Sequence, residues 1–282
     1  MEIINTVKDF ESYRNSFIFN NKSIGFIPTM GALHKGHISL VKRSVDENDI
    51  TIVSVFVNKR QFNDQSDYIN YPVTTERDIE LLEAENCDIL FIPSDEDIYN
   101  NYEGHKMDFM GLDKIYEGEF RPGHFQGVVD IVYRLFEIIR PDRAYFGEKD
   151  FQQLAIIKLM TKQSGLNIDI VPCPIVRENS GLAMSSRNER LSDDLRIKAA
   201  KIYQILKKYS SALTINDSPG DIIKSIANEI NKEDYLETEY IIFCDPETLR
   251  PIEKFEKNMN IRLCLAVWCK KVRLIDNISL HF

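Results

Sequence analysis

The stretch "SIGFIPTMGALHKGHISLV", from Ser23 to Val41, predicts how the fold begins. Its first half is short and almost wholly apolar, which is typical of a buried strand, and it runs into a turn at Gly31. From about Lys35 onward, apolar residues recur at helical intervals with polar residues between them. The segment is therefore expected to form a strand, a glycine-containing turn and a helix that begins near His34.

The segments that follow repeat this alternation of strands and helices. Strand-like runs lie at 51–57, 87–93, 143–150 (a strand and a loop) and 168–176, and helical patterns lie at 76–86, 127–139 and 151–165. The last of these helices has a typical stop signal in Gly165. The alternation predicts an α/β fold in which a doubly wound, mostly parallel sheet carries helices on both faces. Ligands of such sheets bind outside the carboxyl ends of the strands, where the polar motifs of this chain are expected to converge.

The character of the sequence changes after about Val176. A polar stretch rich in small residues, "NSGLAMSSRNERLSD", predicts a loop or hinge at about 177–190. Two helices are expected at Asp194–Leu213 and Asp221–Asn231, followed by three strand-like runs at 239–245, 261–268 and 272–280. We therefore predict two domains, one over 1–176 and a smaller α/β (α+β) domain over 177–282.

Composition argues against several classes of protein. The chain has 282 residues, 43% of them hydrophobic, and a net charge of −9, whereas a protein that binds nucleic acid usually carries a basic excess. It has no apolar run long enough for a membrane span, and its start, "MEIINTVKDFESYR", lacks the apolar block of a signal peptide. The cysteines form no CxxC pair, which predicts reduced thiols in a cytoplasmic protein (Cys87, Cys173, Cys244, Cys264 and Cys269).

Two of the five histidines, His34 and His37, stand three residues apart at the predicted start of a helix. A helix N-terminus presents unpaired N–H groups and the positive end of its dipole, so it suits phosphate. Gly31 lets the backbone approach a ligand closely, and Gly36 lets a ligand or another segment pack on the first turn. The alternatives are two unrelated surface histidines or part of a metal site, although no third ligand lies close in sequence.

At this point the sequence resembles a known family. "HKGH" is a form of the HxGH signature of nucleotidylyltransferases and class I aminoacyl-tRNA synthetases. The longer string "PTMGALHKGHISLV" resembles the pantoate–β-alanine ligases (pantothenate synthetases) in particular. Further stretches in the same order support this: "FVNKRQF", "YPVTTERD", "RPGHFQGV", "FGEKDFQQL", "PIVRENSGLAMSSRN" and "DPETLRPI".

The resemblance implies a Rossmann-like domain that binds ATP and pantoate, a C-terminal lid domain, and a homodimer. It also implies a two-step reaction, in which the pantoate carboxylate attacks the α-phosphorus of ATP and expels pyrophosphate. The amine of β-alanine then attacks the pantoyl adenylate, which gives pantothenate and AMP. Such chemistry needs positioning and charge neutralisation more than a protein nucleophile, and Mg²⁺ would bridge the triphosphate oxygens.

The family's site residues carry over onto matching positions of this chain. His37 would support the α-phosphate, His34 would assist on the triphosphate, Lys149 would hold phosphate, and "MSSR" resembles the counterpart of the KMSKS loop. The catalytic set implied is His34, His37, Lys149, Ser185, Ser186 and Arg187. The ATP-binding set implied is Met30, Gly31, His34, Gly36, His37, Gly147, Glu148, Lys149, Asp150, Val176, Met184, Ser185, Ser186 and Arg187. Taken alone, "GEKD" would be a solvated turn, "MSSR" a polar linker and Val176 a core residue.

Other residues of the matched stretches receive further roles. Gln61 and Gln153 match the family's pantoate-binding glutamines, and an amide suits a ligand with hydroxyls and a carboxylate. Asn58 and Tyr71 are expected to line the same pocket for pantoate and β-alanine, whereas Gln152 is expected to face solvent. Asp78 is a candidate Mg²⁺ ligand, with a helix-dipole surface role as the alternative. His124 is expected to be structural, and His105 and His281 are expected to lie at the surface.

The chain departs from the family pattern at three positions. Lys59 stands where the family usually has a proline, which would fix φ in the turn before Gln61. Val73 and Gln126 stand where arginines are usual. One hypothesis is that Lys59 or Arg60 replaces part of the lost positive charge. These departures concern substrate affinity and leave the reaction class unchanged.

Two rival functions fit part of the pattern. Another nucleotidylyltransferase of the same superfamily would keep "HKGH" but has no reason to keep "GEKDFQQL" with both glutamines. A non-catalytic nucleotide- or RNA-binding module is disfavoured by the acidic net charge and by the presence of Lys149 and Arg187.

Overall fold

The computed structural model describes residues 1–18, 21–63, 65–100 and 102–282. These residues form two compact units. Unit 1 consists of Met1–Glu148 and Gln152–Pro174, and unit 2 consists of Lys149–Phe151 and Ile175–Phe282. The short segment Lys149–Phe151 therefore belongs to unit 2, although the chain on both sides of it belongs to unit 1. The hinge at 177–190 stays a prediction.

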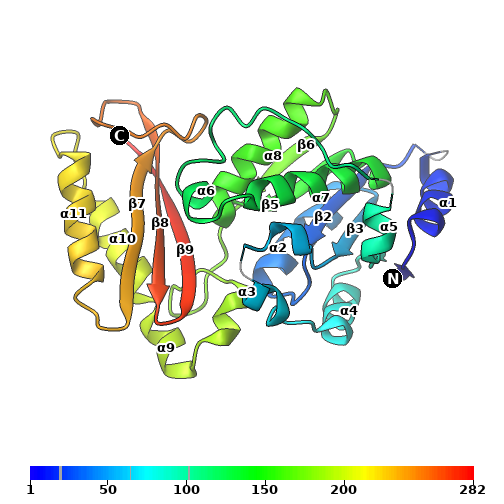
Figure 1. The fold of residues 1–282 in the computed structure, drawn as a ribbon, viewed down its shortest axis with the longest axis horizontal. Helices are drawn as coiled ribbons and strands as arrows, with labels where there is room; N and C mark the ends of the chain where they lie inside the picture. Colours follow the sequence, from blue (N-terminus) through cyan, green and yellow to red (C-terminus); the bar gives the residue numbers. More distant parts are fainter. Residues whose placement is uncertain (19–20, 64, 101) are drawn as a thin grey trace. The chain divides into compact units, whose positions relative to one another are not determined.

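Unit 1 is built on a six-stranded parallel sheet in the order β1-β4-β3-β2-β5-β6. Figure 1 labels four of these strands, β2, β3, β5 and β6. Its strands are β1 (Glu2–Ile4), β2 (Ile24–Thr29), β3 (Ile50–Val55), β4 (Ile89–Phe91), β5 (Arg143–Gly147) and β6 (Asp169–Cys173). From β2 the chain moves through β3 and β4 toward one edge, whereas β5 and β6 lie on the other side of β2. The topological switch point of the sheet therefore lies between β2 and β5, where such folds bind their ligands.

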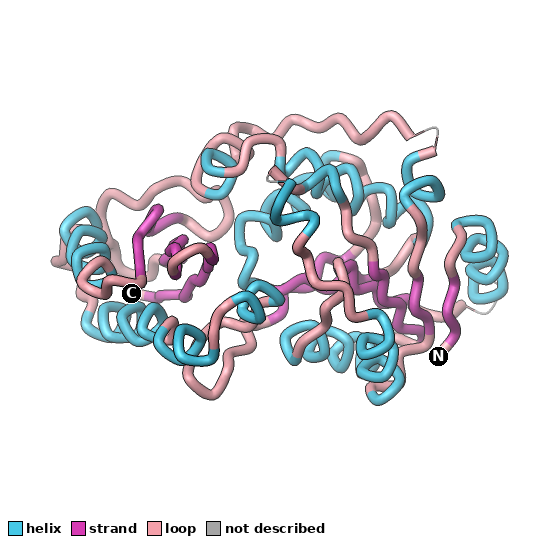
Figure 2. Tube along the Cα trace, turned by 60° about the horizontal axis from the view of Figure 1, so that its bottom comes forward, coloured by secondary structure: helices cyan, strands magenta, loops and turns pink. Residues whose placement is uncertain are grey.

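The strands of this sheet alternate their side chains between two apolar cores. Phe26, Ile52 and Phe146 pack on one side, and their neighbours Ile27 and Val53 pack on the other. Figure 2 shows helices on both sides of the sheet. The first core is covered by α1 (Val7–Ile18), α5 (Asp95–Tyr99), α7 (His124–Ile139) and α8 (Phe151–Gln163), and the second by α2 (Lys35–Glu47) and α4 (Thr75–Ala84). The predicted doubly wound fold is confirmed.

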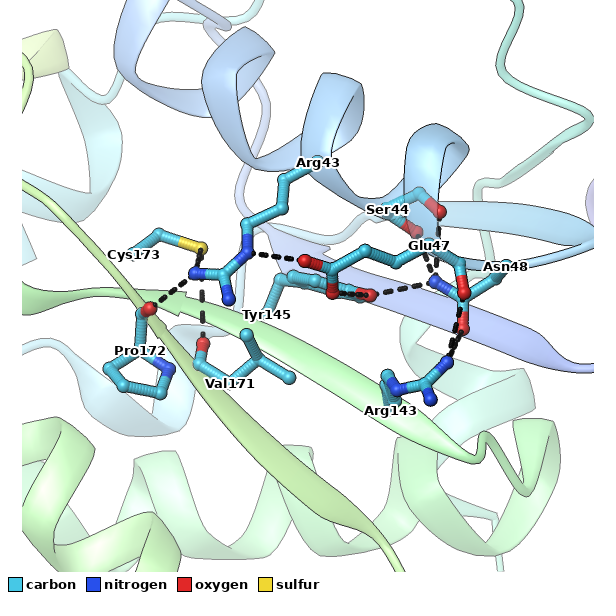
Figure 3. A network of polar contacts seen from close by, with 9 residues as sticks. All are labelled: Arg43, Ser44, Glu47, Asn48, Arg143, Tyr145, Val171, Pro172 and Cys173. Atoms are coloured by element: carbon cyan, nitrogen blue, oxygen red, sulfur yellow. Dashed lines mark hydrogen bonds and ion pairs between the residues drawn. The ribbon is translucent and has the colours of Figure 1, made fainter.

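Helix α2 is fixed on the sheet by a polar network at its C-terminal half (Figure 3). Arg43 donates to Glu47 at 2.9 Å and to the carbonyl of Pro172, at the end of β6, at 2.8 Å. The hydroxyl of Tyr145, on β5, donates to Glu47 at 2.9 Å and accepts from Asn48 at 2.7 Å. The side chain of Tyr145 is fully buried, and this burial raises its pKa to about 12, so the hydroxyl keeps its hydrogen at neutral pH.

Close approach of α2 to β2 requires a glycine at position 25. A Cβ atom on Gly25 would lie 2.1 Å from the hydroxyl oxygen of Ser44 and 2.5 Å from the amide nitrogen of Asn48. Because no side chain separates the two elements here, the helix packs directly on the strand backbone. The C-terminal half of α2 is thus held both by polar contacts and by close packing against the backbone of β2.

Unit 2 contains a three-stranded antiparallel sheet in the order β7-β8-β9. Its strands are β7 (Leu236–Cys244), β8 (Asn260–Cys269) and β9 (Val272–His281), and its longer helices are α9 (Asp193–Lys198), α10 (Lys201–Ala212) and α11 (Pro219–Ile230). Residues from β7 to β9 and from α10 and α11 form one apolar core. This agrees with the expected smaller domain of mixed helix and strand.

The short elements complete the described chain. They are α3 (Gln65–Ile69), α6 (Glu117–Phe120) and three short 3₁₀ helices, η1 (Lys59–Gln61), η2 (Glu148–Asp150) and η3 (Ser186–Arg190). The prediction of a single helix over 194–213 is wrong, because α9 and α10 are separated at Ala199 and Ala200. Within the described ranges, no helix combines the length and the apolar character that a bilayer span requires.

The network in Figure 3 yields a stability prediction. Tyr145→Phe removes a buried hydroxyl that links Glu47 and Asn48. We expect the free energy of unfolding to fall by about 1–2 kcal/mol, because the half-buried Asn48 and the charged, exposed Glu47 each lose the buried hydroxyl as a partner. Urea denaturation measures the change, with Tyr13→Phe, whose residue is 38% exposed, as the control. Equal stabilities of the two variants would contradict the assigned role of the network.

Candidate functional site

The loop that follows β2 is held in a left-handed conformation by one carboxylate. Gly31 and Ala32 have φ values of 79° and 49°. The carboxylate of Asp78, on α4, accepts hydrogen bonds from the N–H groups of Ala32 at 2.9 Å and Leu33 at 2.8 Å, and from the Thr74 hydroxyl at 3.0 Å. This carboxylate therefore offsets the cost of the left-handed turn and sets the direction in which α2 begins.

Asp78 is also the Mg²⁺ ligand that the sequence suggests. Its residue is only 1% exposed, and both of its oxygens already accept backbone N–H groups. This geometry gives it a structural role, so its metal-binding role stays a prediction that the geometry does not favour. Within the described ranges, no cluster of three or more histidine, cysteine or acidic side chains is arranged to hold a metal ion.

The two histidines of "HKGH" cap the start of α2. His34 is the N-cap residue, and its Nδ1 accepts the N–H of Gly36 at 3.1 Å. Nδ1 of His37 accepts the N–H of His34 at 3.3 Å, and the two rings stack with their centroids 4.1 Å apart. Because each Nδ1 is an acceptor, the hydrogen of each neutral ring is on Nε2. The helix start thus carries two adjacent Nε2–H donors beside its first-turn N–H groups, an arrangement suited to phosphate.

Gln61 is oriented by its neighbour Asn58. Oδ1 of Asn58 accepts the N–H of Arg60 at 3.1 Å and the hydroxyl of Tyr99 at 2.6 Å, so its other end is the NH₂ group. That NH₂ group donates to the carbonyl of Gly127 at 2.9 Å and to Oε1 of Gln61 at 3.1 Å. The amide of Gln61 consequently presents its own NH₂ group away from Asn58, on the side of Met30.

Asn58 and His124 support this turn from within. Asn58 is 1% exposed, and its amide is engaged by four partners, so it orients Gln61 rather than offering a group to a ligand. His124 is buried, and its Nδ1 bonds to the carbonyl of Gln61 at 2.7 Å, which agrees with the structural role expected of it. Tyr71 lies nearby in sequence, with its ring edge-on to Phe62 at 5.7 Å.

One expectation about a polar side chain in unit 1 is wrong. Gln152 does not face solvent: it is buried and bonds to Glu117 at 3.0 Å, Leu112 at 2.6 Å and Ile115 at 2.8 Å. The neighbouring Gln153 is half-buried on the first turn of α8. His105, expected at the surface, is half-buried: its ring stacks on Tyr133 at 3.7 Å and bonds to Ser164 at 3.0 Å. Its burial lowers its pKa.

His281 is an exposed residue in unit 2, as expected, and bonds to Asn260 at 2.9 Å.

The positions that depart from the family pattern differ in their surroundings. Val73, which stands where an arginine is usual, is exposed, at 74%. Gln126 donates to Asp130 at 2.8 Å, and Arg60 lies 3.7 Å from the same carboxylate while its guanidinium covers the ring of Tyr99. Arg60 therefore brings a positive charge to the partner of Gln126, and its effect on substrate affinity stays a prediction.

In unit 2 the structure brings together two predicted ATP-binding segments. The N–H of Met184 donates to the carbonyl of Val176 at 3.0 Å, and Arg177 pairs with Ala183 as an isolated β-bridge. Residues 176–184 thus form a closed loop, and "MSSR" starts beside Val176. Ser185 caps η3 by accepting the N–H of Arg187 at 3.3 Å, and Ser186 is buried.

The "GEKD" motif is divided between the units. Gly147 ends β5 in unit 1, and a Cβ atom there would meet nothing within 4 Å, so steric crowding does not require a glycine. Glu148 is the last residue of that segment of unit 1, whereas Lys149 and Asp150 belong to unit 2. Nζ of Lys149 lies 3.4 Å from the carboxylate of Asp150.

Comparisons with known proteins agree with this arrangement. The family described as pantoate-beta-alanine ligase matches residues 2–279. A pantothenate synthetase of Bacteroides fragilis is 46% identical over 279 residues, which cover 99% of each chain. The crystal structure of pantothenate synthetase from Thermus thermophilus is 36% identical, with a TM-score of 0.91 and complete coverage of both chains. A pantoate-beta-alanine ligase from Francisella tularensis, solved with β,γ-ATP and β-alanine, is 39% identical with a TM-score of 0.81, covering 99% of this chain and 97% of its own.

The role of Asp78 can be tested by Asp78→Asn. We expect the free energy of unfolding to fall by about 1–3 kcal/mol, because the amide NH₂ group would face a backbone N–H and leave one donor without an acceptor. Urea denaturation without metal and nucleotide measures this loss, and Glu76→Gln, an exposed acid of the same helical turn, is the control. If Asp78→Asn lowered the free energy of unfolding only in the presence of Mg²⁺ and ATP, this would instead indicate that Asp78 is a metal ligand.

The turn before Gln61 yields a second prediction. Lys59 is the first residue of η1, and the preceding Asn58 is extended, with φ −77° and ψ 103°, so a proline fits at position 59. We expect Lys59→Pro to raise the free energy of unfolding by about 0.4–1 kcal/mol through a less flexible unfolded chain. Thermal unfolding would show the gain. Arg60→Pro is the matched control and should destabilise, since the N–H of Arg60 donates to Asn58; a similar loss in both variants would refute the prediction.

Proposed function

We propose that this chain, which belongs to the pantoate-β-alanine ligase family, condenses (R)-pantoate with β-alanine in an ATP-dependent, AMP-forming reaction. The family match runs over residues 2–279. The observation that carries the proposal is the pair of stacked histidines at the start of α2, directly after β2 and at the switch point of the sheet. That pair supports the proposal because an adenylation step requires fixed donors for phosphate oxygens, and both rings are held in place through Nδ1.

In the first half-reaction, a carboxylate oxygen of pantoate forms a bond to the α-phosphorus of ATP. The bond from that phosphorus to the bridging oxygen of the β-phosphate breaks, and pyrophosphate leaves. His37 donates from Nε2 to the α-phosphate as its charge develops, and His34 donates from Nε2 to the triphosphate. Because both rings are held through Nδ1, these donors need no reorganisation during the step.

In the second half-reaction, the neutral amine of β-alanine attacks the acyl carbon of the pantoyl adenylate. A C–N bond forms, the C–O bond to AMP breaks, and the nitrogen loses a proton. Lys149, Ser185, Ser186 and Arg187 contact phosphate oxygens through an ammonium, hydroxyls and a guanidinium. The nucleoside is contacted by Met30, Gly31, Gly36, Gly147, Glu148, Asp150, Val176 and Met184, with adenine on the backbone of Val176 and the ribose on Asp150.

Pantoate binding rests on Gln61 and Gln153, with Tyr71 in the same pocket. Gln61 presents an NH₂ group, because Asn58 occupies its carbonyl oxygen, so it pairs with an oxygen acceptor of the substrate. A carboxylate or a hydroxyl oxygen of pantoate meets this requirement, whereas a cationic group does not. Asn58 thus acts on the substrate through the orientation of Gln61.

Magnesium enters this scheme together with ATP. The described residues contain no ready-made cluster of metal ligands, and both oxygens of Asp78 accept hydrogen bonds from the protein. These features suit an ion held mainly by triphosphate oxygens and water. Bound in this way, Mg²⁺ would neutralise charge on the triphosphate. From the family resemblance we also propose a homodimer that acts in the cytoplasm, with residues 177–190 as the hinge of a lid.

The proposed reaction predicts pyrophosphate release from ATP and Mg²⁺ that depends on pantoate, followed by AMP and pantothenate once β-alanine is added. A coupled pyrophosphate assay with chromatography of the products measures both steps. Release with other carboxylates or with alcohol phosphates, and none with pantoate, would contradict the proposal and point to another nucleotidylyltransferase. No release with any substrate would point to a binding module.

The same assay tests His37. In His37→Ala we expect kcat to fall by about 10²–10³-fold with little change in ATP affinity, because the donor matters most when charge develops on the α-phosphate. The exposed His281→Ala serves as the control. Weaker ATP binding at an unchanged kcat would show that His37 contributes to ground-state binding instead.

A further inference from the structure

The segment Lys149–Phe151 is joined to unit 2 through two side chains of the antiparallel sheet. The side-chain NH₂ group of Asn277, on β9, donates to the main-chain carbonyl of Lys149 at 3.0 Å. The guanidinium of Arg262, on β8, covers the ring of Phe151 at 4.2 Å. The backbone of the proposed phosphate-binding lysine is therefore fixed from the C-terminal sheet.

Asn277 is itself fixed in one orientation. It is only 2% exposed, and its Oδ1 accepts a hydrogen bond from Nη1 of Arg262 at 3.0 Å. A guanidinium can only donate, so this contact places the oxygen of Asn277 toward Arg262 and its NH₂ group toward Lys149. Its backbone N–H donates to Asp276 at 2.8 Å, and its carbonyl accepts from Arg177 at 3.4 Å.

The same cluster holds the base of the loop 176–184. Arg177 forms a two-pronged ion pair with Asp276, at 2.6 and 2.9 Å, and its guanidinium covers the ring of Tyr203 at 3.6 Å. Arg177 follows Val176 directly, and its bridge partner Ala183 precedes Met184. One hydrogen-bonded cluster thus touches the two segments of unit 2 that carry the proposed contacts to ATP.

We propose that Asn277 is a positioning residue of the ATP site, which fixes the main chain of Lys149 so that its ammonium is presented to phosphate. This inference rests on the proposed function, specifically on the role of Lys149. The side chain of Asn277 acts through Lys149 and touches no substrate. Arg262 supports it by holding the amide in the one orientation that offers a donor to the Lys149 carbonyl.

The test is a double-mutant cycle on ATP binding. Calorimetry with ATP and Mg²⁺, without pantoate, gives the dissociation constant for the full chain and for Asn277→Ala, Lys149→Ala and the double variant. We expect Asn277→Ala to weaken ATP binding about tenfold, which corresponds to the loss of one well-placed hydrogen bond. In the Lys149→Ala background we expect it to have little further effect. The KM for pantoate should remain nearly unchanged.

A matched control separates positioning from plain stability. Arg273, also on the C-terminal sheet, pairs with Glu239, and its cluster includes Trp268 at 2.9 Å from the same carboxylate. Arg262→Met and Arg273→Met should lower the Tm to a similar degree. Only Arg262→Met should also weaken ATP binding, whereas Arg273→Met should leave the ATP affinity unchanged. Arg262→Lys, which keeps a donor for Asn277, should restore part of the affinity. The Arg262 variants also serve if Asn277→Ala does not fold.

Three outcomes would overturn the inference. The first is ATP binding in Asn277→Ala and Arg262→Met that is no weaker than in Arg273→Met. The second is an undiminished effect of Asn277→Ala in the Lys149→Ala background. The third is unchanged ATP binding in Lys149→Ala, which would show that Lys149 does not contribute to phosphate binding. Failure of the proposed function itself would appear separately, as a lack of pantoate-dependent pyrophosphate release by the unmodified chain.

Discussion

The carboxylate of Asp78 is the contact on which the geometry of unit 1 depends. It accepts the N–H groups of Ala32 and Leu33, and so holds a turn whose left-handed residues would otherwise be unfavourable. Because this turn fixes where α2 starts, it also determines that His34 becomes the N-cap residue. In this arrangement Nδ1 of each ring accepts a backbone N–H group, so the hydrogen of each neutral ring is on Nε2. The donor pair thus depends on a buried carboxylate that belongs to another helix, α4.

The other end of α2 is fixed by an unrelated set of contacts. Arg43 and Glu47 link the helix to β6 and to Tyr145 of β5, the two strands on the far side of the switch point (Figure 3). The hydrogen bond from Arg43 lowers the pKa of Glu47, so its carboxylate stays charged at neutral pH. With Asp78 at one end and this network at the other, the helix has little freedom to tilt or slide. A site that works by positioned donors rather than by a nucleophile needs such a scaffold.

Sequence patterns predicted the sheet and the start of α2 because these depend on local periodicity and on turn chemistry. They failed where a partner distant in sequence decides the outcome. Gln152 is buried because its amide meets the backbone of 112–117, and His105 is half-buried because its ring stacks on that of Tyr133. The separation of α9 from α10 falls at Ala199 and Ala200, two strong helix formers that give no signal of a break. Asn277 was missed for the same reason as Gln152, although "LIDN" does place two polar residues inside an apolar strand.

The burial of these two polar residues, Asp276 and Asn277, has to be explained by its free energy. A buried ion pair such as Arg177–Asp276 gains little net stability over an apolar pair of similar volume, because desolvation offsets much of the attraction. Its retention in the core of a small sheet is better explained by geometry than by stability. A guanidinium fork fixes direction as well as distance, and each member of the cluster fixes the next, from Arg177 through Asp276 to Asn277. Apolar side chains could fill the same space, but they could not determine which end of an amide faces the carbonyl of Lys149.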